Sequence, residues 1–425
     1  MERNSDVYKK YVDILKSELL PAMGCTEPIA ISYVAAKARE VLGTVPEEVI
    51  IEASGNIIKN VKSVIVPNTG GLKGIEASAA AGIVAGEPDK LLEVISAVSE
   101  MQKEQIKAYL NEDRIQVKFN DSGIIFDLIV TVKAGSNYAS VRIVNEHTNV
   151  VHIERTGEVL LDKPLSCGDS DRNAEVAMTM DEILDFVKSC NLEDVREVIN
   201  RQIEYNTDIA EEGLRNEWGA NVGSVILSYN DAGDVRIRAK AKAAAGSDAR
   251  MSGCELPVVI NSGSGNQGIT VSVPVIEFAK ELNSTEEELY RALVLANLLG
   301  LHQKAGIGRL SAYCGAVSAG CAAGAGIAYL LHEDDRIIKH VVVNCLAITS
   351  GIICDGAKPS CAAKIASSID AAFLALDMAK ENQQFRSGEG IVKKGIENTI
   401  NSVSKLGKDG MRETDKEILK IMIED

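Results

Sequence analysis

The second half of the chain contains six cysteines, at positions 254, 314, 321, 345, 354 and 361. Cys354 and Cys361 are seven residues apart, across a loop that contains glycine and proline and is predicted to join two helices. Such a loop can direct two thiolates toward one metal, and N–H groups at the start of the second helix would lower the pKa of both thiols. Free cysteine is also one of the most buried residue types, so two inert core thiols are an equally good interpretation.

Cys314 lies near the start of a small-residue helix predicted over 312–331 and offers a third metal ligand. Cys321 follows on nearly the same helical face, so both of these thiols could instead be structural. The number of ligands bears on mechanism. A [4Fe-4S] cluster held by three cysteines leaves one iron open as a Lewis acid, whereas four cysteines suit an electron-transfer centre.

The segment 261–268, with the sequence NSGSGNQG, could bind an anion because it offers several N–H groups and side-chain amides after an apolar run. Its glycines match the G-x-G-x-x-G spacing of dinucleotide-binding loops, but residues 269–273 are predicted to be extended, and that fingerprint requires a helix there. We expect a loop that binds the carboxylate of an amino acid, with an ordinary flexible turn as the alternative. The candidate side chains are those of Asn261, Ser262, Ser264, Asn266 and Gln267.

Cys25 lies in a tight connection, residues 21–28, at or just before the start of a predicted helix. The helix dipole favours the thiolate, which suits a base, a nucleophile or a ligand. Glu27 opposes this effect, so catalytic and structural roles remain equal alternatives. A second polar loop, residues 66–71, is predicted to follow a strand, and its Asn68 and Thr69 are further candidates for substrate binding. An ordinary turn explains that loop at least as well.

Several function classes are disfavoured. The five histidines form no HExxH pair and the chain has no GxSxG, which argues against zinc and serine hydrolases. Acidic residues outnumber basic residues, 61 to 45, and the formal net charge of −16 repels nucleic acid and anionic lipid. The uncharged stretch 312–331 is mostly Ala, Gly, Ser and Cys, which gain little in lipid, so a buried helix is predicted rather than a membrane span.

The first residues are polar, without the apolar segment of a secretory signal, and the nine cysteines are an odd number, which favours reduced thiols. We therefore expect a cytoplasmic protein that acts on a small molecule, with no membrane or nucleic-acid partner. Assembly into a homo-oligomer is left open.

Hydrophobic periodicity predicts an α/β N-terminal part with an antiparallel sheet and a mainly α-helical C-terminal part. In the first part it predicts helices over 6–20, 27–41, 74–84, 89–109, 178–190 and 192–206, strands over 49–53 and 61–66, and alternating strands between 114 and 161. In the second it predicts helices over 284–302, 312–331, 337–350, 360–380 and 390–405. The expected units are N-terminal helices over 1–45 that pack on the catalytic domain, an α/β domain over 46–206 and a helical iron–sulfur domain over 207–425, with 164–173 as the best linker.

Together, the segment PAMGCTEPIA at 21–30, the loop 261–268 and the set Cys314, Cys354 and Cys361 resemble the L-cysteine desulfidase family. That family is similar to the iron–sulfur L-serine dehydratases through their α domain. The resemblance covers essentially the whole chain for the desulfidases and about the C-terminal half for the dehydratases.

The resemblance implies an oxygen-sensitive [4Fe-4S] lyase that converts L-cysteine and water to pyruvate, ammonia and sulfide without pyridoxal phosphate. It implies that Cys314, Cys354 and Cys361 are cluster ligands and that Cys25 is the catalytic thiol, and it assigns no role to Cys321. In the serine dehydratases a cysteine at the far C-terminus can cover the open iron, whereas this chain ends KIMIED, so we consider Cys25 as the residue that fills that position at rest.

Three alternatives remain. An L-serine dehydratase performs the same elimination with water as the leaving group. A pyridoxal phosphate lyase would use 264–266 for the phosphate and Lys358 for the Schiff base. A non-catalytic amino-acid binding protein would contain no iron and release no sulfide.

Overall fold

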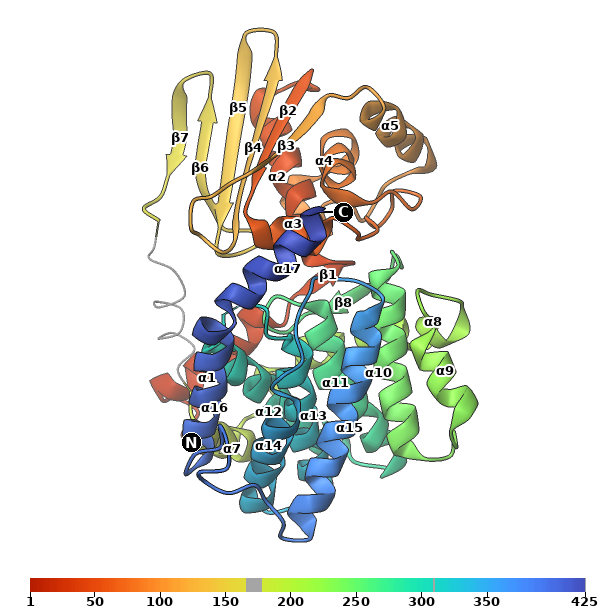
Figure 1. Ribbon diagram of the computed structural model, residues 1–425, viewed down its shortest axis with the longest axis vertical. Coiled ribbons are helices and arrows are strands. Elements are labelled where there is room, and N and C mark those ends of the chain that lie inside the picture. Colours follow the sequence, from red (N-terminus) through yellow and green to blue (C-terminus); the bar gives the residue numbers. More distant parts are fainter. Residues whose placement is uncertain (166–177, 309, 425) are drawn as a thin grey trace.

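The computed structural model describes residues 1–165, 178–308 and 310–424. It contains an α/β part with a largely antiparallel sheet, drawn at the top of Figure 1, above a mainly helical part. The predicted fold class is confirmed. The site described below lies where these two parts meet.

The sheet has six strands in the order β3-β2-β4-β5-β6-β7, and only the β2–β3 pair is parallel. Alternate residues of β2 are buried on one face, which is covered by α2 and α4, and α5 packs on α4. The strands are β2 (Glu48–Ala53), β3 (Ile115–Phe119), β4 (Asp127–Ala134), β5 (Asn137–Val144), β6 (Val150–Arg155) and β7 (Glu158–Asp162). The helices of this part are α2 (Thr26–Leu42), α3 (Gly55–Val61), α4 (Gly74–Ala85), the 3-10 helix η1 (Pro88–Glu93) and α5 (Glu100–Leu110).

Two predictions in this part are wrong. No strand covers 61–66: Val61 ends α3, and Val64 and Val66 are buried in a loop with only one isolated bridge, at Ile65. A short apolar run has the same sequence pattern in a paired strand and in a loop that packs against the core. Here the run is a loop that is buried by packing. The single helix predicted over 89–109 is two elements, because the chain breaks after η1 and a capping box at Ser99 starts α5.

In the helical part, α13 is surrounded by α11, α12, α14 and α15. Its many alanines and glycines are almost all buried, which lets these helices approach closely. The helices are α7 (Met180–Ser189), η2 (Leu192–Asp194), α8 (Arg196–Arg215), α9 (Val222–Tyr229), α10 (Val235–Met251), α11 (Gly265–Glu281), α12 (Glu286–Ala305), α13 (Gly315–Leu330), α14 (Asp335–Thr349), α15 (Ser360–Lys380) and α16 (Ile396–Lys405). Within the described ranges, no helix is long and apolar enough to span a membrane.

The prediction that 269–273 is extended is also wrong, because these residues lie inside α11. Ser264 caps this helix by accepting a hydrogen bond from the Gln267 N–H. The β-branched residues of the segment favour strands locally, but they are buried on all sides by neighbouring helices, and this packing outweighs the local preference.

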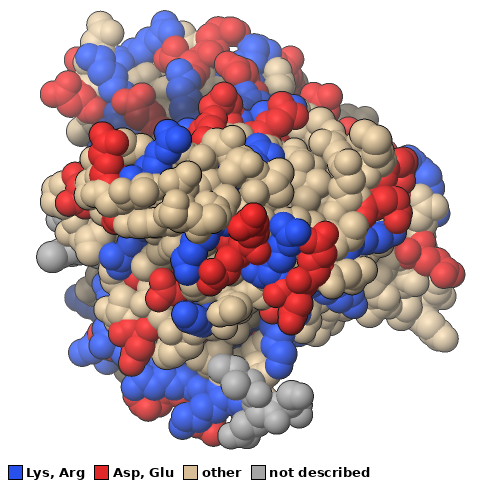
Figure 2. All heavy atoms as spheres, turned by 90° about the horizontal axis from the view of Figure 1, so that it is seen from above, with Lys and Arg blue, Asp and Glu red and all other residues tan. Residues whose placement is uncertain are grey.

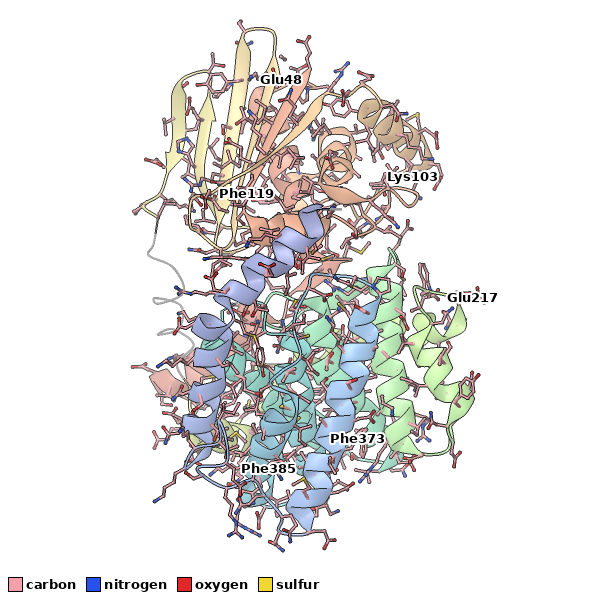
Figure 3. The ribbon with its side chains drawn as sticks, viewed as in Figure 1. Glu48, Lys103, Phe119, Glu217, Phe373 and Phe385 are labelled. Carbon is pink, nitrogen blue, oxygen red and sulfur yellow. The ribbon has the colours of Figure 1, made fainter. Side chains whose placement is uncertain are left out.

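Among the described residues, strand β1 (Pro21–Met23) and helix α17 (Arg412–Glu424) both connect the two parts. Strand β1 pairs antiparallel with β8 (Pro257–Val259). After the π-helical turn η3 (Leu406–Gly410), the C-terminal helix α17 crosses from the helical part and packs on α3, as Figure 1 shows. Phe119, labelled in Figure 3 at the end of β3, lies beside this helix, and Asp415 of α17 forms an ion pair with the buried Lys59.

The division into 1–45, 46–206 and 207–425 remains a prediction. Helix α1 (Asp6–Glu18) packs on α12, whereas α2 packs on the sheet and α8 packs on α10. Most of the predicted linker falls on 166–177, outside the described residues. On the α/β end of the molecule, acidic and basic side chains are interspersed (Figure 2).

Candidate active site

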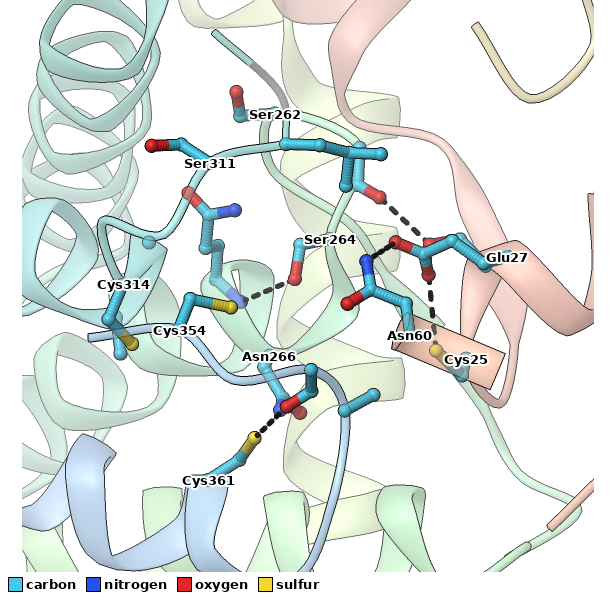
Figure 4. Close-up of a pocket in the computed structure, with 18 of the residues that line it drawn as sticks. Cys25, Glu27, Asn60, Ser262, Ser264, Asn266, Ser311, Cys314, Cys354 and Cys361 are labelled. Carbon is cyan, nitrogen blue, oxygen red and sulfur yellow. Dashed lines mark hydrogen bonds between the residues drawn. The ribbon is translucent and has the colours of Figure 1, made fainter. Parts of the chain in front are cut away.

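A cavity between the two parts contains about 830 Å³ of space not filled by atoms, part of it open to solvent. Its walls include Cys25 from the α/β side and Cys314, Cys354 and Cys361 from the helical side (Figure 4). It therefore brings together four of the chain's nine cysteines from distant positions in the sequence. The other polar lining residues include Thr26, Glu27, Asn56, Lys59, Asn60, His147, Arg250, Ser262, Ser264, Asn266, Gln267, Lys304, Ser311 and Tyr313.

Four helices begin at this cavity. Cys25, Ser264 and Cys314 are the N-cap residues of α2, α11 and α13, and Cys361 lies in the first turn of α15. Each helix directs its unpaired N–H groups and the positive end of its dipole toward the same space. Such an arrangement favours anions, including thiolates and carboxylates.

The three cysteines of the helical wall lie close enough for their charges to interact. Burial, followed by the charge of Cys354, raises the pKa of Cys314 to about 12. The same two effects raise the pKa of Cys361, whose thiol points to the Gly356 carbonyl at 3.6 Å. For both thiols, the pKa-raising effect of burial therefore outweighs the opposite effect of the helix N-termini.

The three thiols are soft donors of the kind that iron and zinc bind in proteins. Within the described ranges, no group of three or more His, Cys, Asp or Glu side chains is arranged to hold one metal ion. Three thiols on one cavity wall, at helix N-termini that favour anions, are the kind of donor set that holds iron–sulfur clusters.

A chain of hydrogen bonds connects Cys25 to the α/β wall. The Cys25 thiol donates to Glu27 Oε2 at 3.1 Å, and Asn60 Nδ2 donates to Glu27 Oε1 at 2.9 Å. Burial and the neighbouring Glu27 charge raise the pKa of Cys25 well above its usual range. Burial also acts to raise the pKa of Glu27, but the His147 charge and the Cys25 hydrogen bond outweigh it and lower that pKa. The resting pair is therefore a thiol and a carboxylate.

Five side chains of the loop that follows β8 were predicted to bind the substrate, and four of them line the cavity. Ser262, Ser264, Asn266 and Gln267 line the cavity. Asn261 does not line it: its side chain is buried and donates hydrogen bonds to the Asn297 backbone and side chain, at 3.2 and 3.0 Å.

Asn68 and Thr69 do not line the cavity either. Asn68 Nδ2 donates to the Ile95 carbonyl at 2.8 Å, and Thr69 Oγ1 donates to the Val66 carbonyl at 2.7 Å. Both side chains are buried. Thr69 stabilises its own loop, whereas Asn68 connects that loop to the segment that follows η1. Cys321 is also outside the lining: it is fully buried in α13 beside Cys345 of α14.

Sequence reasoning missed many polar residues of the walls, and five of them bear directly on the chemistry of the cavity. Lys59 and Asn60 were hidden in the segment where α3 was not predicted. Glu27, two residues after Cys25, was considered only for its charge. His147 and Arg250 have no sequence signal, because only the fold brings the β5–β6 loop and the end of α10 to this space.

The buried atoms of these residues that lack a hydrogen-bond partner include Asn60 Oδ1 and Arg250 Nε. Buried polar atoms are normally hydrogen-bonded, so unpaired ones on a cavity wall indicate a place for a ligand or water.

Comparison with known proteins agrees with this description. A family model described as "Serine dehydratase alpha chain" matches residues 89–420. A UPF0597 protein of Desulfitobacterium hafniense is 59% identical over 100% of this chain and 98% of its own length. A UPF0597 protein of Lachnoclostridium phytofermentans is 53% identical over 98% of this chain and 100% of its own length. A UPF0597 protein of Treponema denticola is 44% identical, with complete coverage of both chains. With three cysteines and an anion-favouring loop around one cavity, and this match over most of its length, the chain belongs to the serine dehydratase alpha chain family.

Proposed function

We propose that the protein is a [4Fe-4S]-dependent carbon–sulfur lyase that eliminates sulfide from L-cysteine to give pyruvate, ammonia and hydrogen sulfide. One observation carries this proposal: Cys314, Cys354 and Cys361 share a cavity with Cys25 and the 262–267 loop. A [4Fe-4S] cluster that is held by three thiols has one iron without a protein ligand. The fourth thiol of the cavity, Cys25, lies on the α/β side, opposite the other three.

The reaction breaks the Cα–H and Cβ–S bonds of the substrate. The electron pair of the Cα–H bond forms a Cα=Cβ double bond, and the pair of the Cβ–S bond leaves with sulfur. The aminoacrylate that results tautomerises to an imine, which water hydrolyses to pyruvate and ammonia. A cluster bound by Cys314, Cys354 and Cys361 would supply a Lewis acid for the sulfur leaving group.

The protein's own residues would handle the proton and the charged ends of the substrate. Cys25 takes or relays the Cα proton, with Glu27 as its hydrogen-bond partner 3.1 Å away. The loop side chains and N–H groups at the start of α11 hold the substrate carboxylate, and Asn60 Oδ1, an acceptor without a partner, suits the ammonium group.

The test is anaerobic reconstitution with iron and sulfide, followed by an absorbance spectrum, an iron assay and removal of excess sulfide. L-cysteine should then yield sulfide and pyruvate in equal amounts. A protein that takes up no iron and turns over no cysteine would contradict the proposal and favour an amino-acid binding protein.

A pair of variants sharpens this test. Cys354→Ser should reduce iron uptake and abolish turnover. Cys190→Ala removes a buried thiol beside Tyr8, remote from the cavity, and should leave both unchanged. Equal effects of the two changes would remove Cys354 from the ligand set.

L-serine dehydration is the second candidate, favoured by the family to which the chain belongs. L-serine in the same assay would decide the matter, since turnover of serine above that of cysteine would reassign the substrate. A pyridoxal phosphate enzyme is less well supported, because Lys358 is not among the cavity residues and its Nζ pairs with Asp355 at 2.9 Å.

A further inference from the structure

Arg250, at the C-terminal end of α10, carries a buried positive charge on the cavity wall. The residue is only 2% exposed. Its Nη1 donates to Asn266 Oδ1 at 3.1 Å, and its Nε–H has no hydrogen-bond partner. Among the described residues, no carboxylate forms an ion pair with it. Each of the other arginines of this helix, Arg236 and Arg238, pairs with an Asp or Glu.

A buried charge without a counter-ion is costly. Removing a guanidinium from water is compensated only when an anion and further hydrogen bonds replace the solvent. The Asn266 amide oxygen is a neutral acceptor. The charge of Arg250 also acts on the Glu27 carboxylate, but the two groups form no ion pair among the described residues, so the guanidinium keeps an unpaired N–H donor for a further anion. The missing partner is therefore an anion that arrives through the cavity.

The space around Arg250 is shaped for that anion. A methyl group added at Gly265 would lie 2.2 Å from Arg250 Nε, so a glycine is required for the guanidinium to lie against the 262–267 loop. Gly265 is the first residue of α11, where unpaired N–H groups meet the positive end of the helix dipole. A planar fork of N–H donors beside a helix N-terminus matches a carboxylate, which has two acceptor oxygens.

Among the described lining residues, the other charged groups already have partners. Lys59 pairs with Asp415 of α17, the charge of His147 acts on Glu27, and Lys304 also has an interaction partner. Glu27, the one Asp or Glu among the described residues that line the cavity, accepts hydrogen bonds from Cys25, Thr26 and Asn60. Arg250 is thus the cation of the wall that is left for an incoming carboxylate.

We propose that Arg250 is the residue that binds the α-carboxylate of the substrate, and that Gly265 is the position that gives it room to do so. This inference rests on the proposed function for the identity of the ligand, a small α-amino acid, but its test does not require turnover.

The test measures binding of two probes by calorimetry, with the full-length protein before and after iron–sulfide reconstitution. L-alanine has the amine and carboxylate but no leaving group, and L-alaninamide lacks the carboxylate charge. The wild type should bind L-alanine more tightly by roughly 10- to 100-fold, the size of a hydrogen bond to a charged group. In Arg250→Gln this preference should fall to near unity, and Arg250→Lys, which keeps the charge without the fork, should be intermediate.

Arg238→Gln is the matched control, because Arg238 lies on the same helix but binds Glu277 and Glu281. It should keep the wild-type preference for L-alanine. Circular dichroism and thermal unfolding would verify that each variant is folded. Gly265→Ala should behave like Arg250→Gln, because its methyl group displaces the guanidinium.

Equal losses of affinity for both probes in Arg250→Gln would overturn the inference, since a structural residue would weaken both. A wild type without preference for L-alanine would overturn it as well. Failure of the proposed function gives a different result: the preference for L-alanine depends on Arg250, but no sulfide is released from L-cysteine.

Discussion

The thiol of Cys25 is subject to opposing forces. The start of α2 and the positive charge of Arg250 favour its thiolate, whereas burial and the carboxylate of Glu27 favour the thiol. Burial and the Glu27 carboxylate have the larger effect, so the pKa of Cys25 is raised. If Cys25 is the base, as proposed, its thiol must first lose its proton, and the Glu27 carboxylate accepts a hydrogen bond from that thiol at 3.1 Å.

Glu27→Gln should lower the pKa of Cys25, because it removes the adjacent negative charge. If Cys25 acts as thiolate, kcat/KM for L-cysteine rises with pH as the thiol ionises, and the variant should show this rise at lower pH. The alkylation rate of Cys25 by iodoacetamide, followed by mass spectrometry, should shift in the same direction in protein without iron.

Cys25→Ser should abolish turnover while most of the cluster absorbance remains, since Cys25 is not one of the three proposed ligands. Retained activity would remove Cys25 from the mechanism. A change in the spectrum of the resting cluster would instead support its role as a fourth ligand at rest.

At the scale of elements, the site depends on helices that begin at the same place. The start of α11 is set by backbone contact: a methyl group added at Gly268 would lie 1.9 Å from the carbonyl oxygen of Val259 in β8. Because β8 pairs with β1, which leads directly to Cys25, this contact connects the 262–267 loop to the Cys25 side of the cavity.

Gly268→Ala should therefore destabilise the protein by about 1–3 kcal/mol, the usual cost of overpacking, and weaken substrate binding. Gly351→Ala is the control, since a methyl group there meets no atom within 4 Å. Urea unfolding of both variants would measure the difference. Equal stability of the two would show that β8 moves away at little cost.

At the scale of the whole molecule, stability should depend on pH through Asp248. This residue is fully buried, its Oδ2 accepts from the Gly223 N–H at 3.2 Å, and its Oδ1 has no partner. Burial raises its pKa to about 6. Between about pH 4 and about pH 6 the folded state thus binds more protons than the unfolded state, so this residue makes the protein less stable as pH rises.

Asp248→Asn keeps the acceptor for the Gly223 N–H and removes the charge. The variant should be more stable than the wild type at pH 7, by up to about 3 kcal/mol, and the difference should shrink toward pH 4. Thermal unfolding of the iron-free protein across this range would measure it. A difference that does not change with pH would show that Asp248 does not titrate in this range.

Glu277→Gln should change the stability of the protein at pH 7 in the opposite direction to Asp248→Asn. Burial acts to raise the pKa of Glu277, but hydrogen bonds from Lys242 and Arg238 prevail and lower it. This carboxylate stabilises the fold above its unfolded pKa, and the stabilisation is lost as pH falls through the lower folded value. The variant should therefore be less stable than the wild type at pH 7 and approach it in acid.

The sequence by itself determined the elements with strong periodicity and the fold class, and its resemblance to a known family indicated which cysteines to expect at the site. These features are local: alternation marks β4 and β5, and small residues mark the buried α13. The apolar runs at 61–66 and 269–273 are short. There, burial by elements distant in sequence determined the structure and outweighed the local preference for strand.

Only the tertiary structure decided which residues meet. Asn68, Thr69 and Asn261 have suitable side chains, but the fold turns them toward their own loops or the core. Glu27, Asn60 and Arg250 have ordinary local surroundings in the sequence and become functional candidates because β1–β8 pairing and the docking of α3 bring them to one cavity. The physical reason is that burial and charge pairing depend on neighbours distant in sequence.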